Sequence, residues 1–147
     1  MNIENMRSAI NIMKRAGKID MRKWQEIKNG DKALGSEEEL HYCGTAACFA
    51  GWIAVSPEWK KFGGRIDERY GTPYIPIKEN LDKTYYSSKA IAYWLDIPKS
   101  YSIELCALNT TIKNEEYYGV EINDITKEMV IEKLEEIIEK DDIVFKI

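Results

Sequence analysis

Apolar residues recur every three or four positions in several short stretches of the chain, and this spacing predicts amphipathic helices. The first stretch predicts a helix over 3–16 that ends at Gly17. A second predicted helix covers 20–27, with Asp20 as its cap. Residues 28–40 are polar and contain glycines, which predicts a surface loop.

The most apolar stretch lies at 45–55, where almost every residue is small or apolar. This pattern predicts a helix that is buried on all sides. Ser56 and Pro57 end the helix, and residues 58–62 add one further turn. Residues 63–86 are rich in glycine, proline and tyrosine, which predicts an irregular loop or a small hairpin.

Two helical patterns follow this loop. Ser87 or Ser88 caps a predicted helix that runs through Leu95. Pro98 then opens another predicted helix, which runs through Leu108.

The clearest pattern closes the chain. Thr126 caps a predicted helix whose apolar face runs from Val130 to Ile138, while glutamates take the opposite face. Together the patterns predict a mainly α fold, with five or six short helices in a single compact domain over 1–147. We expect its core to include Trp24, Phe49, Trp52, Ile53, Trp94, Leu95, Leu134 and Ile138.

Composition narrows the class of protein. The 147 residues, 44% of them hydrophobic, are enough to bury a core, and the net charge is -4. Acidic residues gather in 111–147, and the rest lacks the broad basic surface that binds duplex nucleic acid. Membrane spans and signal peptides need longer apolar stretches, so we expect a cytoplasmic protein with no membrane partner. The three cysteines form no even disulfide framework and are expected as reduced thiols.

The stretch HYCGTAACFAGW, residues 41–52, holds the only histidine and two of the three cysteines. One interpretation is a thiol enzyme or a zinc site built from His41, Cys43, Cys48 and Cys106. A cysteine hydrolase needs a base that reaches the sulfur, normally a histidine distant in sequence and oriented by a third group, and structural zinc sites use paired ligands at short spacings. The chain matches neither pattern. We therefore assign no catalytic residue, no metal ligand and no cofactor, and favour a protein that is not an enzyme.

A second interpretation of the same stretch is anion binding. If Gly44 and Thr45 form the first turn of the buried helix, capped by Cys43 or Thr45, their unpaired amides attract negative charge. Arginines and tyrosines of the following loop can then close over a nucleotide. This hypothesis gives the predicted ligand-binding residues His41, Cys43, Gly44, Thr45, Arg65, Arg69 and Tyr70.

Two structural interpretations compete with anion binding. Asp20 can accept the hydrogens of the same amides, which would make the motif an internal cap. Alternatively, small residues one turn apart, Cys48 and Gly51 among them, can let another helix approach closely, while Trp52 fills the next layer.

The runs IDMRKW at 19–24 and CGTAACFAGW at 43–52 resemble those of a group of small proteins from phages and other mobile elements. Later features of that group are matched by YGTPY at 70–74, AIAYWLDI at 90–97 and DITKEMVIEKL at 124–134. The resemblance covers most of the chain. It implies a phage-encoded accessory protein that acts in the cytoplasm of the infected host cell.

We therefore expect a protein that binds a host protein or a small anionic ligand of the nucleotide type, and so counters host antiviral defence. The alternative is a DNA-binding regulator, because 88–105 loosely matches a helix-turn-helix with Asp96 in place of the usual glycine. Its second helix offers Lys99 but lacks the arginines and base-reading amides of such helices. The sequence leaves the oligomeric state open.

Overall fold

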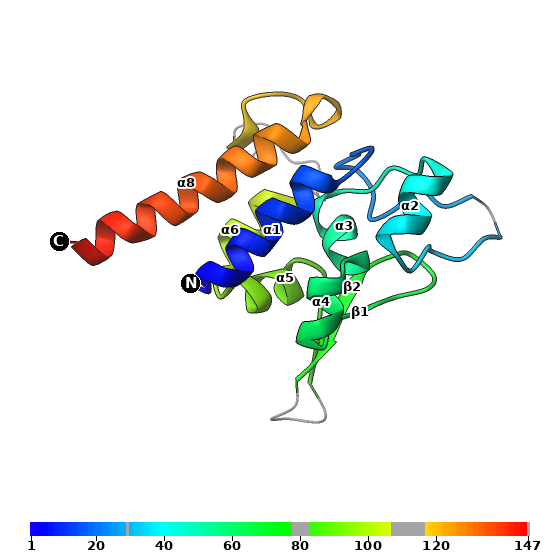
Figure 1. Cartoon of the computed structure of the whole chain (residues 1–147), viewed down its shortest axis with the longest axis horizontal. Coiled ribbons are helices and arrows are strands. Elements are labelled where there is room, and N and C mark those ends of the chain that lie inside the picture. The colour runs from blue at the N-terminus through cyan, green and yellow to red at the C-terminus, as the bar shows by residue number, and fades with distance from the viewer. Residues whose placement is uncertain (29, 78–82, 107–116, 147) are drawn as a thin grey trace.

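The computed structural model describes residues 1–28, 30–77, 83–106 and 117–146, with side chains as far as residue 141. Helices dominate the fold, and one small sheet lies against them (Figure 1). The α-helices are α1 (Ile3–Arg15), α2 (Glu37–Cys43), α3 (Phe49–Val55), α4 (Pro57–Phe62), α5 (Ser87–Leu95), α6 (Lys99–Cys106) and α8 (Lys127–Lys146). A 3-10 turn, η1, covers Ile122–Asp124. The mainly α prediction is confirmed, but the described residues hold seven α-helices rather than five or six, and a three-stranded sheet is added.

α1 and α8 pack along each other, as Figure 1 shows. Asn2 begins α1 by accepting the amide hydrogen of Asn5 at 3.0 Å. Thr126 begins α8 in the same way, with its hydroxyl 3.3 Å from the amide of Met129, so the predicted cap is confirmed. Leu134 on α8 is fully buried in the core that these helices share.

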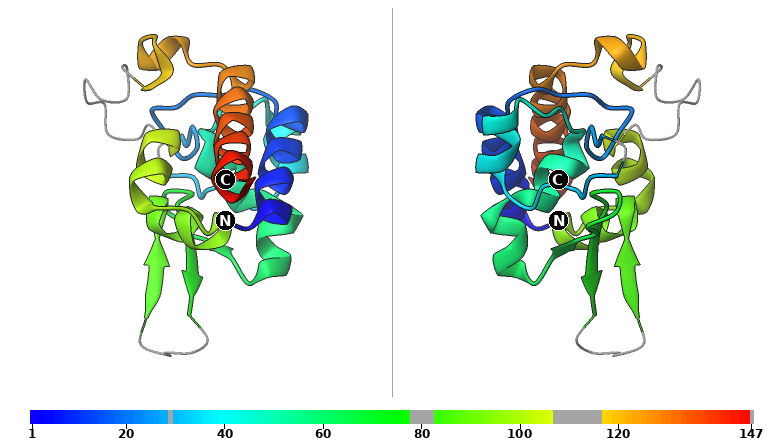
Figure 2. Two further views of the ribbon diagram at one scale, coloured as in Figure 1. Left: turned by 90° about the vertical axis from the view of Figure 1, so that its left-hand side faces the viewer. Right: turned by 90° about the vertical axis from the view of Figure 1, so that its right-hand side faces the viewer.

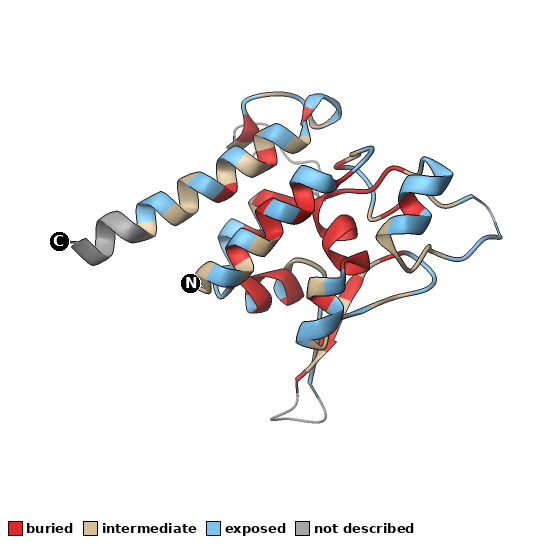
Figure 3. Ribbon diagram, viewed as in Figure 1, coloured by how far each residue is buried: buried red, intermediate tan, exposed pale blue. Residues whose placement is uncertain are grey.

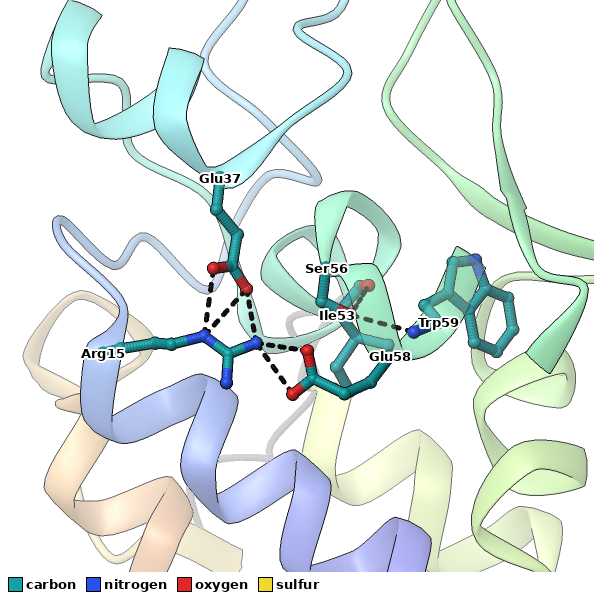
Figure 4. Close-up of polar contacts among 6 residues, drawn as sticks. All are labelled: Arg15, Glu37, Ile53, Ser56, Glu58 and Trp59. Atoms are coloured by element: carbon teal, nitrogen blue, oxygen red, sulfur yellow. Dashed lines mark hydrogen bonds and ion pairs between the residues drawn. The ribbon is translucent and has the colours of Figure 1, made fainter. Parts of the chain in front are cut away.

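α3 lies at the centre of the molecule, and all of its residues are buried (Figure 3). Ser56 separates it from α4 by capping both helices. Its hydroxyl donates to the carbonyl oxygen of Ile53 at 2.7 Å and accepts from the amide of Trp59 at 3.2 Å (Figure 4). Pro57 occupies the first position of α4, where a missing N–H costs nothing. The predicted break and the short helix after it are confirmed.

One arginine joins three helices on the surface. Arg15, at the end of α1, binds Glu37 of α2 with its Nη2 2.8 Å from Oε1, and Glu58 of α4 with Nη2 2.5 Å from Oε1 (Figure 4). The hydrogen bond with Glu37 contributes most to raising the pKa of the guanidinium. Because all three side chains are partly exposed, water screens these pairs and the gain in stability is modest.

The sheet comprises β1 (Arg65–Ile66), β2 (Pro73–Pro76) and β3 (Thr84–Tyr86), antiparallel and in that order. Ile75 is buried on the face that meets α3 and α5. The hairpin of β2 and β3 extends on the side of the molecule away from α8 (Figures 1 and 2). The expected loop or small hairpin at 63–86 is thus an ordered sheet where the structure describes it.

Four local predictions are wrong. The predicted surface loop at 28–40 gives way to a helix at Glu37, where α2 begins with Ser36 accepting the amide hydrogen of Glu39. Residues 20–27 form turns and extended backbone instead of a helix. The central helix begins at Phe49, not at Thr45. Ser87 has a φ of 62°, and α5 begins without a side-chain cap. The expected end of the next helix at Leu108 lies outside the described residues.

The core prediction is largely confirmed. Six of the eight expected residues are buried, and Trp24 and Ile138 are partly buried against the same cluster. The cluster joins side chains from α1, α3, α5, α6, α8 and the sheet into one core. This core fixes the positions of α4, β3, α5 and α6, whose outer surfaces form the candidate site described below.

Candidate functional site

The two motifs that dominate the sequence form one backbone junction. The segment 18–26 runs beside residues 46–48 and exchanges main-chain hydrogen bonds with them. Asp20 donates its amide hydrogen to the carbonyl oxygen of Ala47 at 3.0 Å, and Cys48 donates to the carbonyl oxygen of Lys23 at 2.9 Å. The indole N–H of Trp52 donates to the carbonyl oxygen of Lys18 at 3.0 Å. The residues that make the motif conspicuous therefore hold the segment 18–26 to α3.

Gly51 is the residue that allows this close approach. A Cβ at Gly51 would lie 1.8 Å from the carbonyl oxygen of Trp24, which no side chain can tolerate. Cys48 begins α3 beside it, with Sγ accepting the Gly51 amide hydrogen at 3.4 Å. The close approach matches the packing interpretation of the small residues, but the approaching segment is not the helix that was expected.

Gly44 ends a helix rather than beginning one. It has a φ of 63° and forms the left-handed cap of α2, a conformation that glycine adopts without strain. The Gly44 amide donates to the carbonyl oxygen of His41 at 3.2 Å, and the Thr45 amide donates to the carbonyl oxygen of Leu40 at 3.0 Å. Both amides thus have partners within the chain, so the physical basis of the anion-binding hypothesis is wrong.

Asp20 does not cap those amides either. Its carboxylate accepts the amide hydrogen of Arg22 at 3.0 Å and binds the Arg22 guanidinium at 2.9 Å. The hydrogen bond from Arg22 contributes most to lowering the pKa of Asp20. Asp20 closes its own turn in the segment 18–26, and the junction with α3 is made by the backbone.

The predicted ligand-binding residues lie in three places. His41 packs its ring against Trp52, with the centroids 5.1 Å apart. Cys43 and Thr45 line a hollow of about 360 Å³ whose other wall includes Lys28 and Lys32. His41 and Cys43 are two residues apart on α2, a spacing at which helical side chains do not face each other.

The predicted residues of the following loop lie on the sheet. Arg65 is exposed on β1 and pairs in register with Tyr74. Arg69 and Tyr70 lie at the tip of the hairpin between β1 and β2, with the guanidinium carbon 5.1 Å from the Tyr70 ring centroid. Binding at the seven predicted residues stays a prediction, and the geometry gives it no shared site.

The buried thiols are poor nucleophiles. Burial raises the pKa of Cys48 to about 12, and burial also raises the pKa of Cys106. Cys43 is exposed. Within the described ranges, no three His, Cys, Asp or Glu side chains gather in a group that could hold a metal ion.

A different surface brings together aromatic rings from three elements, two of them exposed and one partly buried. Phe62 of α4, Tyr85 of β3 and Tyr93 of α5 form a chain, with centroids 6.0 Å apart for Phe62 and Tyr93 and 5.5 Å apart for Tyr85 and Tyr93. Phe62 is 39% exposed and Tyr93 45% exposed. Large rings at this exposure are unusual in a helix-rich core and typical of interaction surfaces.

These rings line a shallow hollow of about 510 Å³, here called the α5 hollow, whose wall also holds Lys89 and Lys99. The Lys89 ammonium lies 4.5 Å from the centroid of the Tyr85 ring, a cation–π contact. Asp96 is the acidic residue of the wall, and its carboxylate lies 3.3 Å from the N-terminal ammonium group. The hollow therefore combines aromatic faces with positive charge.

Sequence reasoning did not assign the α5 hollow. One local signal was available, because Lys89 and Tyr93 are four residues apart and so share a face of α5. Phe62 and Tyr85 reach the hollow only through the packing of α4 and β3, which no local pattern specifies.

α5 and α6 form a helix–turn–helix around Asp96, which adopts the left-handed conformation with φ 53°. On α6, Ser102 is buried and donates to the carbonyl oxygen of Ser88 at 2.6 Å. Lys99, Ser100 and Tyr101 are exposed in its first turn. The geometry of the corner matches the DNA-binding alternative, while the exposed side chains offer a single cation.

None of the described helices is long and apolar enough to cross a membrane. Comparison with protein-family models, with curated proteins and with solved structures found no match.

Proposed function

We propose that the chain is a binding protein and that the α5 hollow takes a planar, anionic ligand of the nucleotide type. The observation that carries the proposal is the convergence of Phe62, Tyr85 and Tyr93 from three elements, with Lys89 over one ring. Packing alone would favour burial of such rings, yet two of them are more than a third exposed.

The chemistry of the hollow suits the two halves of a nucleotide. A base has two apolar π-faces and stacks on aromatic side chains, which stabilises single-stranded nucleic-acid complexes by about 1–3 kcal/mol per base. A phosphate needs cations, and Lys89 and Lys99 line the same wall. The base would lie against Tyr93 and the phosphate near the two lysines.

The biological setting belongs to the same proposal. The motifs at 19–24 and 43–52 resemble those of small phage and mobile-element proteins, which implies an accessory protein that acts inside the infected cell. We propose that the ligand is a nucleotide of the host's antiviral response, and that binding it removes the signal. The resemblance supports this setting, and the α5 hollow supports the class of ligand.

A thermal-shift screen with mononucleotides, cyclic nucleotides and ADP-ribose-type nucleotides tests the proposal. A ligand at 100 times its Kd stabilises the native state by about 2.7 kcal/mol, which is readily measured. We expect Tyr93→Leu and Lys89→Met each to reduce the shift, because they delete the stacking face and the charge but keep much of the side-chain volume.

Tyr42→Leu and Lys14→Met are matched controls, since Tyr42 is 94% exposed on α2 and Lys14 is exposed on α1. Both controls should keep the shift. A shift that survives Tyr93→Leu and Lys89→Met unchanged would place the ligand elsewhere, and the absence of any shift would contradict the nucleotide class.

The α5–α6 corner supports a second candidate, a DNA-binding regulator. Asp96 takes the left-handed conformation that glycine usually takes in such turns, and Lys99 begins the second helix. A gel-shift titration at rising salt tests this directly, because phosphate contacts make affinity fall steeply with salt. Since Lys99 is the one cation on the exposed first turn of α6, we expect no shift at physiological salt.

A further inference from the structure

A second aromatic hollow begins on the other side of the α5–α6 turn. This α8 hollow, of about 400 Å³, is lined by Tyr101, Tyr117, Lys133 and Ile137. Asp96 and Ile97 belong to the walls of both hollows. The two hollows therefore meet at the turn 96–98.

The two hollows repeat one arrangement of side chains. In the α5 hollow, Lys89 lies over the Tyr85 ring and Tyr93 is exposed beside it. In the α8 hollow, Lys133 lies over Tyr117 with its ammonium 4.9 Å from the ring centroid, and Tyr101 is 43% exposed. Each side of the turn thus has one half-buried ring in a cation–π contact with a lysine, and one exposed ring.

The charges of the two hollows differ. Lys89 and Lys99 face a single acid, Asp96, in the α5 hollow. The α8 hollow has Lys133 and Lys140 against Asp96, Glu136 and Asp141, and Glu136 already pairs with Lys133 at 3.5 Å. A phosphate is therefore favoured on the α5 side. A neutral base is favoured on the α8 side, where carboxylates can accept hydrogens from its exocyclic amine.

Tyr117 is suited to contact a neutral group. Its hydroxyl is half-buried near Glu104 and Glu136, and burial, followed by these two carboxylates, raises its pKa to about 12. A tyrosine hydroxyl is protonated at neutral pH even at its ordinary pKa, and at the wall of the α8 hollow it can donate a hydrogen bond to a base.

We propose that the ligand carries two nucleobases joined through phosphate, with one base in each hollow and the phosphate link crossing the turn 96–98. This inference rests on the proposed function, because it adds a second base to the nucleotide in the α5 hollow. A cyclic dinucleotide, a linear dinucleotide and a short single strand share this chemistry.

Isothermal titration calorimetry on the full chain with AMP, cyclic di-AMP, linear ApA and a short oligo-dA strand tests the inference. At least one two-base probe should bind more tightly than AMP. Tyr101→Leu should weaken that probe by roughly 5- to 150-fold, the effect of losing one stacked base, and leave AMP unchanged. Tyr93→Leu should weaken both AMP and the two-base probe by a similar factor.

Tyr42→Leu and the melting temperature of each variant control for the substitution itself. The two-base inference is overturned, and the proposed function stands, if AMP binding depends on Tyr93 while no two-base probe binds more tightly than AMP. It is also overturned if Tyr101→Leu leaves every two-base probe unaffected. If neither AMP nor any two-base probe binds, the proposed function fails as well. The probe that binds most tightly identifies whether the two bases belong to a cyclic dinucleotide, a linear dinucleotide or a single strand.

Discussion

Two regions of the molecule differ in where their polar groups and rings are directed. One is the junction between 18–26 and 46–52, and the other is the α5 hollow. At the junction, main-chain amides find carbonyl partners inside the chain, and Trp52 donates its indole hydrogen to Lys18. In the α5 hollow, Phe62 and Tyr93 keep more than a third of their surface in solvent, and Lys89 lies over Tyr85 at the surface. The first region is internally satisfied, whereas the second has capacity left for another molecule.

This difference shows that the conspicuous residues of the stretch 41–52 make contacts that hold the fold together. Histidine, cysteine, glycine and tryptophan crowd the stretch 41–52, yet most of that chemistry is used to hold α2, α3 and the segment 18–26 together. Tyrosines and lysines are common residues, but their shared exposure on α4, β3 and α5 gives the molecule a surface suited to binding. The predictions below test the two regions separately.

The largest expected effect is on the junction. Gly51→Ala places a Cβ 1.8 Å from the carbonyl oxygen of Trp24, so the segment 18–26 must move away from α3. Helix propensity alone would favour alanine by about 1 kcal/mol. The steric cost exceeds this gain, and we expect the free energy of unfolding to fall by about 3 kcal/mol or more.

Chemical denaturation measures this change, with Gly35→Ala as the control. An added Cβ at Gly35 meets no atom within 4 Å, so its effect should stay within about 0.5 kcal/mol. Equal stability of the two variants would show that the segment 18–26 is not packed on α3 as described.

Per pH unit, a smaller effect is expected from alkaline pH. Burial raises the pKa of Cys48 to about 12, so the native state keeps a proton that the unfolded chain releases above about pH 9. The stabilisation is complete below pH 9 and is lost as pH rises towards 12, by up to roughly 1.4 kcal/mol per pH unit. Cys48→Ala should reduce the slope of unfolding free energy against pH, as measured by urea titrations. An unchanged slope would contradict the burial of this thiol.

Thiol labelling compares the accessibility of cysteines at the junction with that of a cysteine at the surface. It is the prediction with the smallest expected effect on stability. Cys43 is exposed, whereas Cys48 and Cys106 are buried with raised pKa values. Iodoacetamide at neutral pH should modify Cys43 in the native protein, and all three cysteines after unfolding. Mass spectrometry of the digested protein measures this. Modification of native Cys48 at the rate of Cys43 would show that the junction opens to solvent.

Local patterns predicted those elements whose stability is local. α1 and α8 have continuous apolar faces and side-chain caps at Asn2 and Thr126, and Pro57 marks the start of α4. The segment 20–27 has some helical spacing, but its backbone pairs with residues 46–48, which are distant in sequence. Tertiary pairing therefore overrode a weak local preference.

The candidate site was predictable only in part. The sequence predicts that Gly44 begins a helix, whereas in the structure it ends one. Glycine permits both a close ligand approach and a left-handed cap, and only the backbone conformation distinguishes these two roles. The face shared by Lys89 and Tyr93 follows from helical spacing. Phe62 and Tyr85 reach this face of α5 only because of how α4 and the sheet pack on the core. The spacing of residues along the sequence does not contain that information.

The central claim is that the ligand binds at the exposed rings of α5 and not beside the conspicuous stretch 41–52. The most direct test is the Kd of the best nucleotide from the thermal-shift screen, measured by calorimetry for Tyr93→Leu and for Thr45→Val. We predict that Tyr93→Leu weakens binding by 1–3 kcal/mol, the energy of one stacked base, while Thr45→Val leaves the Kd unchanged. Loss of binding in Thr45→Val with an unchanged Kd in Tyr93→Leu would contradict the account.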